Sequence, residues 1–302
     1  EEGLPFADGL NIEIIPDSST REAALRTRIV DTMQMEPFDA RDLQNDNPGV
    51  SFQSFESAGA GIEVAFKTTA PPFDDIRVRR AAFMAMNPWG AIEDIWQGGA
   101  YVSLGVPPVN ANWLLGRDEL SQYLNQPAEA QSLIRETGTA ASIPVTITVG
   151  DFGGALMAHA ERIAAEMRAV GFNPSIELVN RRVFGDEVWL GGNYQMFVGP
   201  IAPLTSANSY LISILHSQGR WNTTGHQDAE LDALIEQQAR EFDPSRRGEL
   251  LREIQRRAFE GAYRFMPAAS APIWAWWPRV QNFHPNFAGS EYSHWSRMWV
   301  RN

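Results

Sequence analysis

Apolar and polar positions follow two different periods along the chain, and each period predicts a different kind of element. Short apolar or alternating runs predict β-strands at residues 10–15, 62–66, 145–149, 175–179, 196–198 and 273–280. Helical spacing, which follows a Ser/Thr cap in the first case, predicts α-helices at residues 18–28, 155–170, 228–235 and 246–262. Residues 39–50 are polar and contain a turn signal at 45–49. Strands and helices in this order indicate the α/β fold class.

Residues 71–82 combine a rigid diproline segment with the start of an amphipathic helix. Pro72 fixes its own φ and biases the preceding Pro71 toward extended backbone. Asp74 and Asp75 can accept hydrogen bonds from the first free N–H groups of a helix that begins near Ile76. We interpret this segment as the crossover into a second lobe.

Six segments along the chain carry motifs in a fixed order. These segments are residues 4–25, 71–82, 123–138, 155–179, 228–262 and 272–280. In turn they give a strand leading into a helix, the diproline opening, a helix with tyrosine, proline, alanine and glycine, a helix–glycine–strand unit, a helical pair and a returning strand. Together they resemble the extracellular solute-binding proteins of family 5, the capture subunits of peptide and nickel type ABC importers.

The resemblance implies an α/β fold of the two-lobed periplasmic-binding-protein type (class II, cluster C-like). Residues 1–70 are expected in lobe I, residues 71–270 in a mainly helical α/β lobe II, and residues 271–302 in a segment that returns to lobe I. The two crossings, at residues 68–72 and 268–278, are expected to form a hinge that lets the lobes close around a ligand.

The resemblance also implies that the first lobe is incomplete in this chain. In the family a long N-terminal region precedes the position of Glu1 and supplies much of the first lobe and one wall of the cleft. Without that region, strand edges that normally pair would stay exposed. We expect the chain to be a fragment, a processed product or one part of a split protein, completed by a separate N-terminal chain or a missing N-terminal region. The alternative is a naturally shortened relative.

Composition and charge narrow the class of protein. The chain has 302 residues, of which 44% are apolar, so it can bury a core large enough for two domains. Its net charge of -12 argues against nucleic acid as a partner, because phosphate backbones attract clustered Lys and Arg. The absence of cysteine excludes disulfides, thiolate catalysis and cysteine metal sites.

Targeting signals are not evident in the sequence. No apolar run is long enough to cross a bilayer. The acidic pair Glu1 and Glu2 differs from the basic start of a secretory signal, so we expect no signal peptide within this chain. The resemblance alone implies a periplasmic location, or an extracellular one with a lipoprotein anchor.

The chain offers little material for catalysis or metal binding. Its histidines are scattered without the spacing of a zinc site, and we interpret them as surface or capping residues: His159, His216, His226, His284 and His294. The glycines at 150–154 follow a strand and precede a helix but lack the spacing and the lysine of a P-loop, so we interpret them as a turn. We expect no catalytic residue, no metal and no cofactor.

A solute site is predicted between Tyr194 and Asn222. There a strand breaks into a loop stiffened by two prolines, and the N-terminus of a helix with free N–H groups follows. Aromatic side chains in this region offer large contact area to a peptide or sugar, and by resemblance the loop faces the cleft. The predicted ligand-binding residues are Phe197, Gly199, Pro200, Ser206, Asn208, Tyr210, Arg220, Trp221 and Asn222.

One substitution in the loop separates this chain from peptide-binding members of the family. In those relatives an aspartate after the strand pairs with the amino group of the ligand, whereas this chain has Pro200 there and Pro203 at the next acidic position. A proline cannot make that charge-assisted contact, so recognition of a free peptide N-terminus is in doubt. Arg181, Arg182 and Arg220 are candidates to bind an acidic group.

The function implied by the resemblance is that of the substrate-binding subunit of an ABC importer. It would capture a peptide-like or other small polar solute by lobe closure and deliver it to a membrane permease, without making or breaking a bond. Two alternatives stay open. An interaction subunit would expose a large apolar patch outside the cleft, and an enzyme would gather groups with perturbed protonation inside it.

Overall fold

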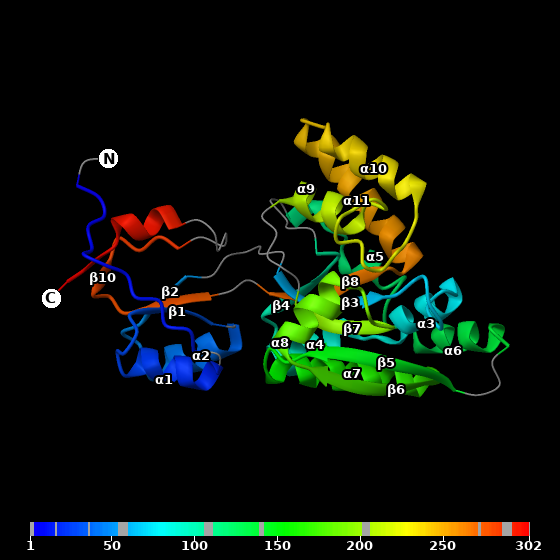
Figure 1. Cartoon of the computed structure of the whole chain (residues 1–302), viewed down its shortest axis with the longest axis horizontal. Coiled ribbons are helices and arrows are strands. Elements are labelled where there is room, and N and C mark those ends of the chain that lie inside the picture. Colours follow the sequence, from blue (N-terminus) through cyan, green and yellow to red (C-terminus); the bar gives the residue numbers. More distant parts are fainter. Residues whose placement is uncertain are drawn as a thin grey trace. The chain divides into compact units, whose positions relative to one another are not determined.

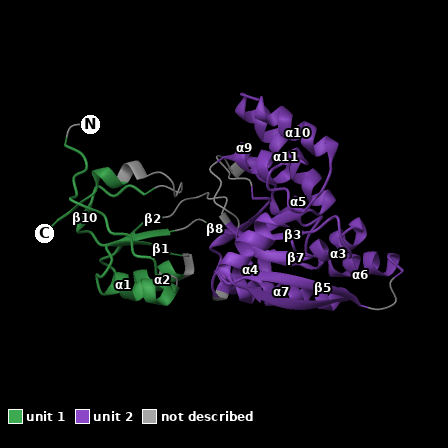
Figure 2. Ribbon diagram, in the orientation of Figure 1, with its two compact units in different colours: residues 1–58, 270–302 green, residues 59–269 purple. Residues whose placement is uncertain are grey.

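The computed structural model describes residues 3–15, 17–35, 37–53, 60–105, 111–138, 142–200, 206–270, 273–285 and 292–301. Two units, each compact in itself, make up the chain (Figures 1 and 2). Unit 1 comprises residues 1–58 and 270–302, and unit 2 comprises residues 59–269. The expected first boundary was residue 70, and the division lies earlier because the strand that starts at Ala60 belongs to the sheet of unit 2.

Unit 2 is built on a six-stranded sheet. Its strands, in spatial order, are β4 (Ala100–Ser103), β8 (Arg264–Ser270), β3 (Ala60–Phe66), β7 (Met196–Pro200), β5 (Ile143–Gly150) and β6 (Phe172–Val179). Strand β5 runs parallel to β6 and β7, whereas β3 and β7 are antiparallel. The sheet is therefore mixed, and strands from both ends of unit 2 meet in its middle.

Helices surround this sheet. They are α3 (Ile76–Ala85), α4 (Pro88–Trp96), α5 (Arg117–Leu120), α6 (Pro127–Glu136), α7 (Gly154–Val170), α8 (Arg181–Val183), α9 (Ala207–Tyr210), α10 (Ala229–Ala239) and α11 (Pro244–Gly261). Short 3₁₀ or π turns add η1 (Ala111–Trp113), η2 (Phe184–Leu190) and η3 (Leu211–Leu215). Helix α7 packs on β5 and β6, and α10 packs on α11 (Figure 1).

The start of α3 confirms the predicted helix and its cap, whereas the prediction that this segment is the crossover is wrong, because α3 lies inside unit 2 and the chain enters that unit near residues 58–59. Asp75 has extended backbone and accepts a hydrogen bond from the backbone N–H of Arg77 at 2.8 Å. Helices α7, α10 and α11 likewise form where helical spacing was predicted. Asp228 and Asp243 cap the last two, each by accepting a hydrogen bond from a backbone N–H three residues on.

Phenylalanine rings join α3, α11 and the middle of the sheet. Phe66 on β3 stacks on Phe73 with ring centroids 4.3 Å apart, and Phe83 on α3 contacts Phe265 on β8 at 4.7 Å. Phe259 on α11 completes the group, and all five rings are buried. Because this contact set spans distant parts of the sequence, it fixes how the helices lie on the sheet.

Unit 1 has a smaller sheet of three antiparallel strands. These are β1 (Thr32–Met35), β9 (Ile273–Trp276) and β2 (Ser51–Gln53), with β9 in the centre. The unit also contains α1 (Ser18–Arg26), α2 (Pro37–Asp46), η4 (Tyr292–Arg297) and the short pair β10 (Val280–Gln281) and β11 (Trp299–Val300). Leu25, Met33, Leu43 and Ala275 form the centre of its core.

Several predicted elements differ in the structure. The predicted strand at 10–15 is wrong: these residues form no regular secondary structure, and no backbone–backbone hydrogen bond joins them to another described residue, whereas a strand requires a paired neighbour. The polar segment 39–50 is mostly helix α2, followed by a turn. The run 273–280 is interrupted by a turn between β9 and β10, and Asp17 rather than Ser or Thr caps α1.

Asp228 connects α10 to α11 as well as capping its own helix. Its carboxylate accepts hydrogen bonds from Arg257 Nε at 2.8 Å and from the Tyr263 hydroxyl at 3.0 Å, in addition to the Leu231 N–H. Burial alone would raise the pKa of the Asp228 carboxyl, but these donors outweigh burial and the net pKa lies below its usual value.

We expect Phe66→Ala to lower the free energy of unfolding of unit 2 by about 3–5 kcal/mol, because it leaves a cavity under Phe73 and Phe83. Phe242→Ala is the control, since that side chain is 95% exposed and its removal should change stability by less than about 0.5 kcal/mol. Equilibrium urea unfolding, analysed with a transition for each unit, measures both. Equal effects of the two substitutions would contradict this account of the core.

We expect Asp228→Asn to cost about 1–3 kcal/mol at neutral pH, because asparagine keeps the helix cap but loses the ionic hydrogen bonds to Arg257. A carboxyl with a depressed folded-state pKa stabilises the fold above its unfolded pKa and loses that effect as the pH falls through its folded pKa. The difference from the unsubstituted chain should therefore shrink in acid. Asp243→Asn, an exposed cap without such a partner, is the control in the same urea titrations.

Candidate functional site

The predicted site region spans β7, α9, η3 and the loop that follows. The structure describes its residues 194–200 and 206–222, so Pro203 and the rest of the proline loop lie outside the described residues. Within these limits the nine predicted residues occupy three places: the end of β7, the first turn of α9, and the loop after η3.

Phe197 and Gly199 on β7 are buried. Phe197 contacts Phe184 and Tyr194 edge to face, with ring centroids 5.6 and 4.9 Å away. A Cβ on Gly199 would lie 2.0 Å from Cζ of Phe184, so only glycine lets this ring pack against the strand. In the described structure both residues support the strand end, while Pro200, the last residue of β7, is partly exposed.

The first turn of α9 is fixed by side chains. Ser206 and Ser209 form a capping box in which each hydroxyl accepts a hydrogen bond from the backbone N–H of the other at 3.1 Å. Asn208 Oδ1 accepts hydrogen bonds from Gln238 Nε2 at 2.8 Å and from Arg247 Nη2 at 3.1 Å. The position of Asn208 is thus set by α10 and α11, and Ser206 remains exposed at the helix start.

Tyr210 ends this turn inside the protein, against a charged pair that the sequence did not predict. Its hydroxyl lies 2.5 Å from the Leu104 carbonyl oxygen and 3.4 Å from Glu63 Oε1. Glu63 on β3 in turn faces Arg264 on β8, with 3.5 Å between Oε1 and Nε, and all three side chains are fully or almost fully buried.

Burial raises the pKa of the Glu63 carboxyl despite the neighbouring guanidinium. Glu63 Oε2 and Arg264 Nη2 have no hydrogen-bond partner among the described residues. An incompletely paired charge of this kind is costly to bury, and it sits directly behind α9. A single acidic residue inside the apolar run at 60–66 was the sequence signal for it.

The loop after η3 presents an accessible aromatic surface. Trp221 is half-buried and packs on Trp189 of η2, with ring centroids 5.1 Å apart. The guanidinium carbon of the exposed Arg220 lies 5.9 Å from the centre of the Trp221 ring. An indole face beside a cation suits a flat or acidic solute group. The sequence did not single out Trp189.

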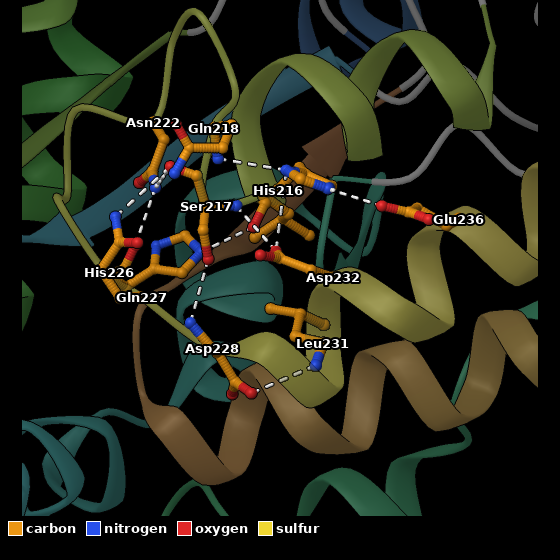
Figure 3. Close-up of polar contacts among 11 residues, drawn as sticks. His216, Ser217, Gln218, Asn222, His226, Gln227, Asp228, Leu231, Asp232 and Glu236 are labelled. Atoms are coloured by element: carbon orange, nitrogen blue, oxygen red, sulfur yellow. Dashed lines mark hydrogen bonds and ion pairs between the residues drawn. The ribbon is translucent and has the colours of Figure 1, made fainter.

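Hydrogen bonds hold this loop to α10 (Figure 3). The Ser217 N–H donates to Asp232 Oδ1 at 2.7 Å, and the Ser217 hydroxyl accepts from the Asp228 N–H at 3.0 Å. Asn222 Nδ2 donates to the carbonyl oxygens of Ser217 and His226. The side chain of Asn222 is used within the loop, so its described role is to fix the position of Trp221.

Two histidines are buried rather than at the surface, which corrects the interpretation of all five as surface or capping residues. His226 lies 2.6 Å from Thr224 Oγ1 and 2.6 Å from the Leu215 carbonyl oxygen, and burial lowers its pKa to about 4. His159 accepts a hydrogen bond from Trp96 Nε1 at 3.3 Å, and burial likewise lowers its pKa to about 4.

Arg181 and Arg182 lie on α8 and have local contacts. Arg181 donates to the Asp151 carbonyl oxygen at 3.0 Å and its guanidinium lies 5.2 Å from the Phe152 ring centre, while Arg182 is 3.5 Å from Asp186. The glycines at 150–154 form the strand-to-helix turn that was predicted. Across the described ranges, no cluster of three His, Asp or Glu side chains could hold a metal ion.

No helix in the described part of the chain is both long enough and apolar enough to cross a bilayer.

Known proteins resemble this chain over long stretches. It is 31% identical over 133 residues to "Heme-binding protein A" of Haemophilus influenzae, which covers 43% of this chain and 23% of that protein. It is 28% identical over 208 residues to "Di/tripeptide-binding protein 2" of Pseudomonas aeruginosa, covering 63% and 38% respectively. The chain thus spans less than half the length of these curated relatives.

The fold matches a solved structure over its full length. The structure of the binding protein (PBP) AgaA in complex with agropinic acid, from A. tumefacien R10, superposes with a TM-score of 0.83 at 18% identity and covers 100% of this chain and 62% of that one. The predicted α/β fold of the periplasmic-binding-protein type is therefore confirmed.

The model of the family "Bacterial extracellular solute-binding proteins, family 5 Middle" matches residues 1–222, which is more than half of the sequence. The chain therefore belongs to the family 5 bacterial extracellular solute-binding proteins, as its motifs predicted.

Proposed function

We propose that the chain is the solute-capturing part of the substrate-binding subunit of an ABC importer. The observation that carries this proposal is the family match over residues 1–222, joined to a fold that superposes over the whole chain on a solute-bound protein. In this proposal the chain is not an enzyme, and capture makes and breaks no bond. The partner that receives the solute is an ABC permease in the membrane.

The ligand class follows from the site and not from the relatives, since the relatives named above bind different compounds. Pro200 supplies no carboxylate for a ligand amine, and the exposed Arg220 beside Trp221 favours a neutral or acidic group. We infer a peptide-like or other small polar solute whose end near β7 carries no positive charge. Of the nine predicted residues, the proposed solute contacts are those that are exposed or partly exposed: Pro200, Ser206, Asn208, Arg220, Trp221 and Asn222. Phe197, Gly199 and Tyr210 are buried, so their proposed role is to support the site.

Capture by lobe closure requires the solute to bind the closed form more tightly than the open one. The proposed hinge consists of residues 68–72 and 268–278, of which only the second stretch includes a crossing between the units, since the chain passes between them near residues 58–59 and 269–270. We also propose a location outside the cytoplasmic membrane, with a lipoprotein anchor as the means of retention. A further polypeptide that completes lobe I would be a second partner.

Native mass spectrometry of the protein as purified tests the proposal directly, because tightly held solutes often survive purification. A retained small molecule that exchanges with added solute is expected.

Calorimetry with trialanine and with N-acetyl-trialanine then tests the role of Pro200, and the acetylated peptide should bind at least as tightly. Tighter binding of the free amine by about tenfold would show that another group replaces the aspartate.

We expect Trp221→Ala to weaken affinity for the retained solute by about tenfold or more, because it removes the main accessible aromatic surface of the site. Trp89→Ala is the matched control: that ring is also half-buried and carries a guanidinium, from Arg117, 4.9 Å from its centre. Calorimetry should show unchanged affinity for the control. Equal affinity of both variants and the unsubstituted protein would remove Trp221 from the site.

A further inference from the structure

His216 lies where η3 ends and the loop that carries Arg220 and Trp221 begins. Its backbone N–H donates to the Leu211 carbonyl oxygen at 2.8 Å and so completes the last turn of η3. The side chain of His216 is 19% exposed, so its ring contacts groups of the protein more than solvent. What the ring contacts therefore bears on how the loop is held.

The ring nitrogen Nδ1 accepts a hydrogen bond from the backbone of its own loop. The Gln218 N–H donates to Nδ1 at 3.1 Å (Figure 3). Nδ1 can accept only when it carries no proton, so in this arrangement the ring is neutral and its proton is on Nε2. Nε2 in turn lies 3.6 Å from Glu236 Oε1. The turn at residues 217–219 thus depends on one tautomer of His216.

Two carboxylates of α10 face the same ring (Figure 3). Nδ1 is 3.8 Å from Asp232 Oδ1, and Asp232 and Glu236 lie four residues apart, which places them on one face of the helix. Glu236 Oε2 also lies 3.5 Å from Arg240 Nη2. Each ring nitrogen of His216 therefore has a carboxylate beside it that can form an ion pair with the protonated ring.

The other charged or titratable groups around the loop keep their state in mild acid. The pKa of Asp228 lies below its usual value, and burial lowers the pKa of His226 to about 4. The guanidinium groups of Arg220 and Arg240 do not lose their protons in proteins. Histidine is the side chain that takes up a proton between about pH 8 and pH 5.5, so a response of this loop in that range points to His216.

A second proton on His216 breaks the bond from Gln218. The Nδ1–H and the Gln218 N–H would then be two donors 3.1 Å apart, and two donors cannot bond to each other. The acceptor nearby is Asp232 Oδ1, which also accepts the Ser217 N–H at 2.7 Å. The ring has to turn toward α10, and the turn at residues 217–219 loses one of its hydrogen bonds.

Backbone contacts pass this change on to Trp221. The Gly219 N–H donates to the His216 carbonyl oxygen at 2.7 Å, and the Trp221 N–H donates to the Ser213 carbonyl oxygen at 2.7 Å. A Cβ on Gly219 would lie 2.6 Å from that same Ser213 oxygen, so the loop lies directly against the backbone of η3. Residues 216–222 therefore form one compact turn whose shape depends on its first residue.

We propose that His216 is a positioning residue of the solute site: its neutral ring, through the bond from Gln218, holds Trp221 in place, and its protonation releases the turn. The partners of the protonated ring are Asp232 and Glu236. Mild acid then weakens solute binding through the protein itself. This inference rests on the proposed role of Arg220 and Trp221 in binding, but its first test needs no solute.

Nitrogen-15 NMR of the whole chain is that first test. At about pH 8 the His216 ring should have a protonated Nε2 and an unprotonated Nδ1, and the Gln218 amide and Trp221 indole signals should shift together with the ring signals as the pH falls to about 5.5. In His216→Asn, Oδ1 replaces Nδ1 as an acceptor but does not titrate, so both shifts should disappear. His284→Asn, at an exposed histidine of unit 1, is the control and should keep them.

Calorimetry with N-acetyl-trialanine measures the effect on binding, because the carboxylate of this peptide keeps its charge over the same range. Affinity should fall about threefold or more between about pH 8 and pH 5.5, the scale expected when one hydrogen bond that orders the loop is lost. His216→Asn should bring the ratio of the two affinities to about one, whereas His284→Asn should keep it.

Three results would overturn the proposal. They are titration of the His216 ring without movement of the Gln218 and Trp221 signals, movement that persists in His216→Asn, and an affinity that stays constant while the signals move. Absence of peptide binding at every pH would instead contradict the proposed ligand class, and the NMR titration would still decide whether His216 positions the turn.

Discussion

The pairing of β3 with β8 is the constraint on which the rest of the larger unit depends. Strand β3 begins that unit and β8 ends it, yet the two are neighbours in the sheet. They approach so closely that a Cβ at Gly61 would lie 2.3 Å from the Ala268 carbonyl oxygen, which only glycine avoids. The chain therefore enters and leaves unit 2 through two neighbouring strands. Residues 67–263 connect the end of β3 to the start of β8 and make up the rest of the unit.

The two faces of β3 serve different purposes because successive side chains point in opposite directions. Phe66 points into the phenylalanine core with Phe73 and Phe83. Glu63 points to the other face, where it meets Arg264 and the Tyr210 hydroxyl. The apolar face supplies stability, whereas the charged face sets the position of α9 and so of the proposed solute site. A buried ion pair often adds little to the stability of the fold, because removing both charges from water costs about as much as their attraction returns. We therefore assign the pair of Glu63 and Arg264 a role in positioning α9.

Much of the secondary structure could be predicted from local signals in the sequence. Asp75, Asp228 and Asp243 are the N-caps of the helices that follow them. An N-cap contacts only the first turn of its own helix, so it can be predicted without knowing the tertiary structure. Features that depend on distant residues could not be predicted from local patterns. The run 10–15 alternates apolar and polar residues as a strand does, but whether it forms a strand depends on a second segment that pairs with it. The His226 ring is buried against the Leu215 carbonyl oxygen as well as the neighbouring Thr224 hydroxyl, and the contact with Leu215, eleven residues earlier, could not be predicted from the residues beside His226.

The candidate site was predictable as a region and less so by residue. Strand, break and helix start were visible between Tyr194 and Asn222, and the family resemblance pointed to the same place. The inward direction of Phe197 and Tyr210 depends on Phe184 and Glu63, which lie outside that window. Trp189 was missed because it reaches Trp221 from a π-helical turn far back in the chain. Side-chain direction at the ends of elements is set by such partners and not by local pattern.

The neutral ring of His226 has a consequence for how acidity acts on this protein. With a pKa of about 4, the folded loop keeps the same hydrogen bonds to Thr224 and Leu215 across the range of about pH 5 to 8 in which free histidine titrates. The unfolded chain does take up a proton near pH 6.5, so mild acid weakens the fold without breaking these two bonds. The hydrogen bonds that His226 gives to the loop before α10 therefore stay the same over this pH range.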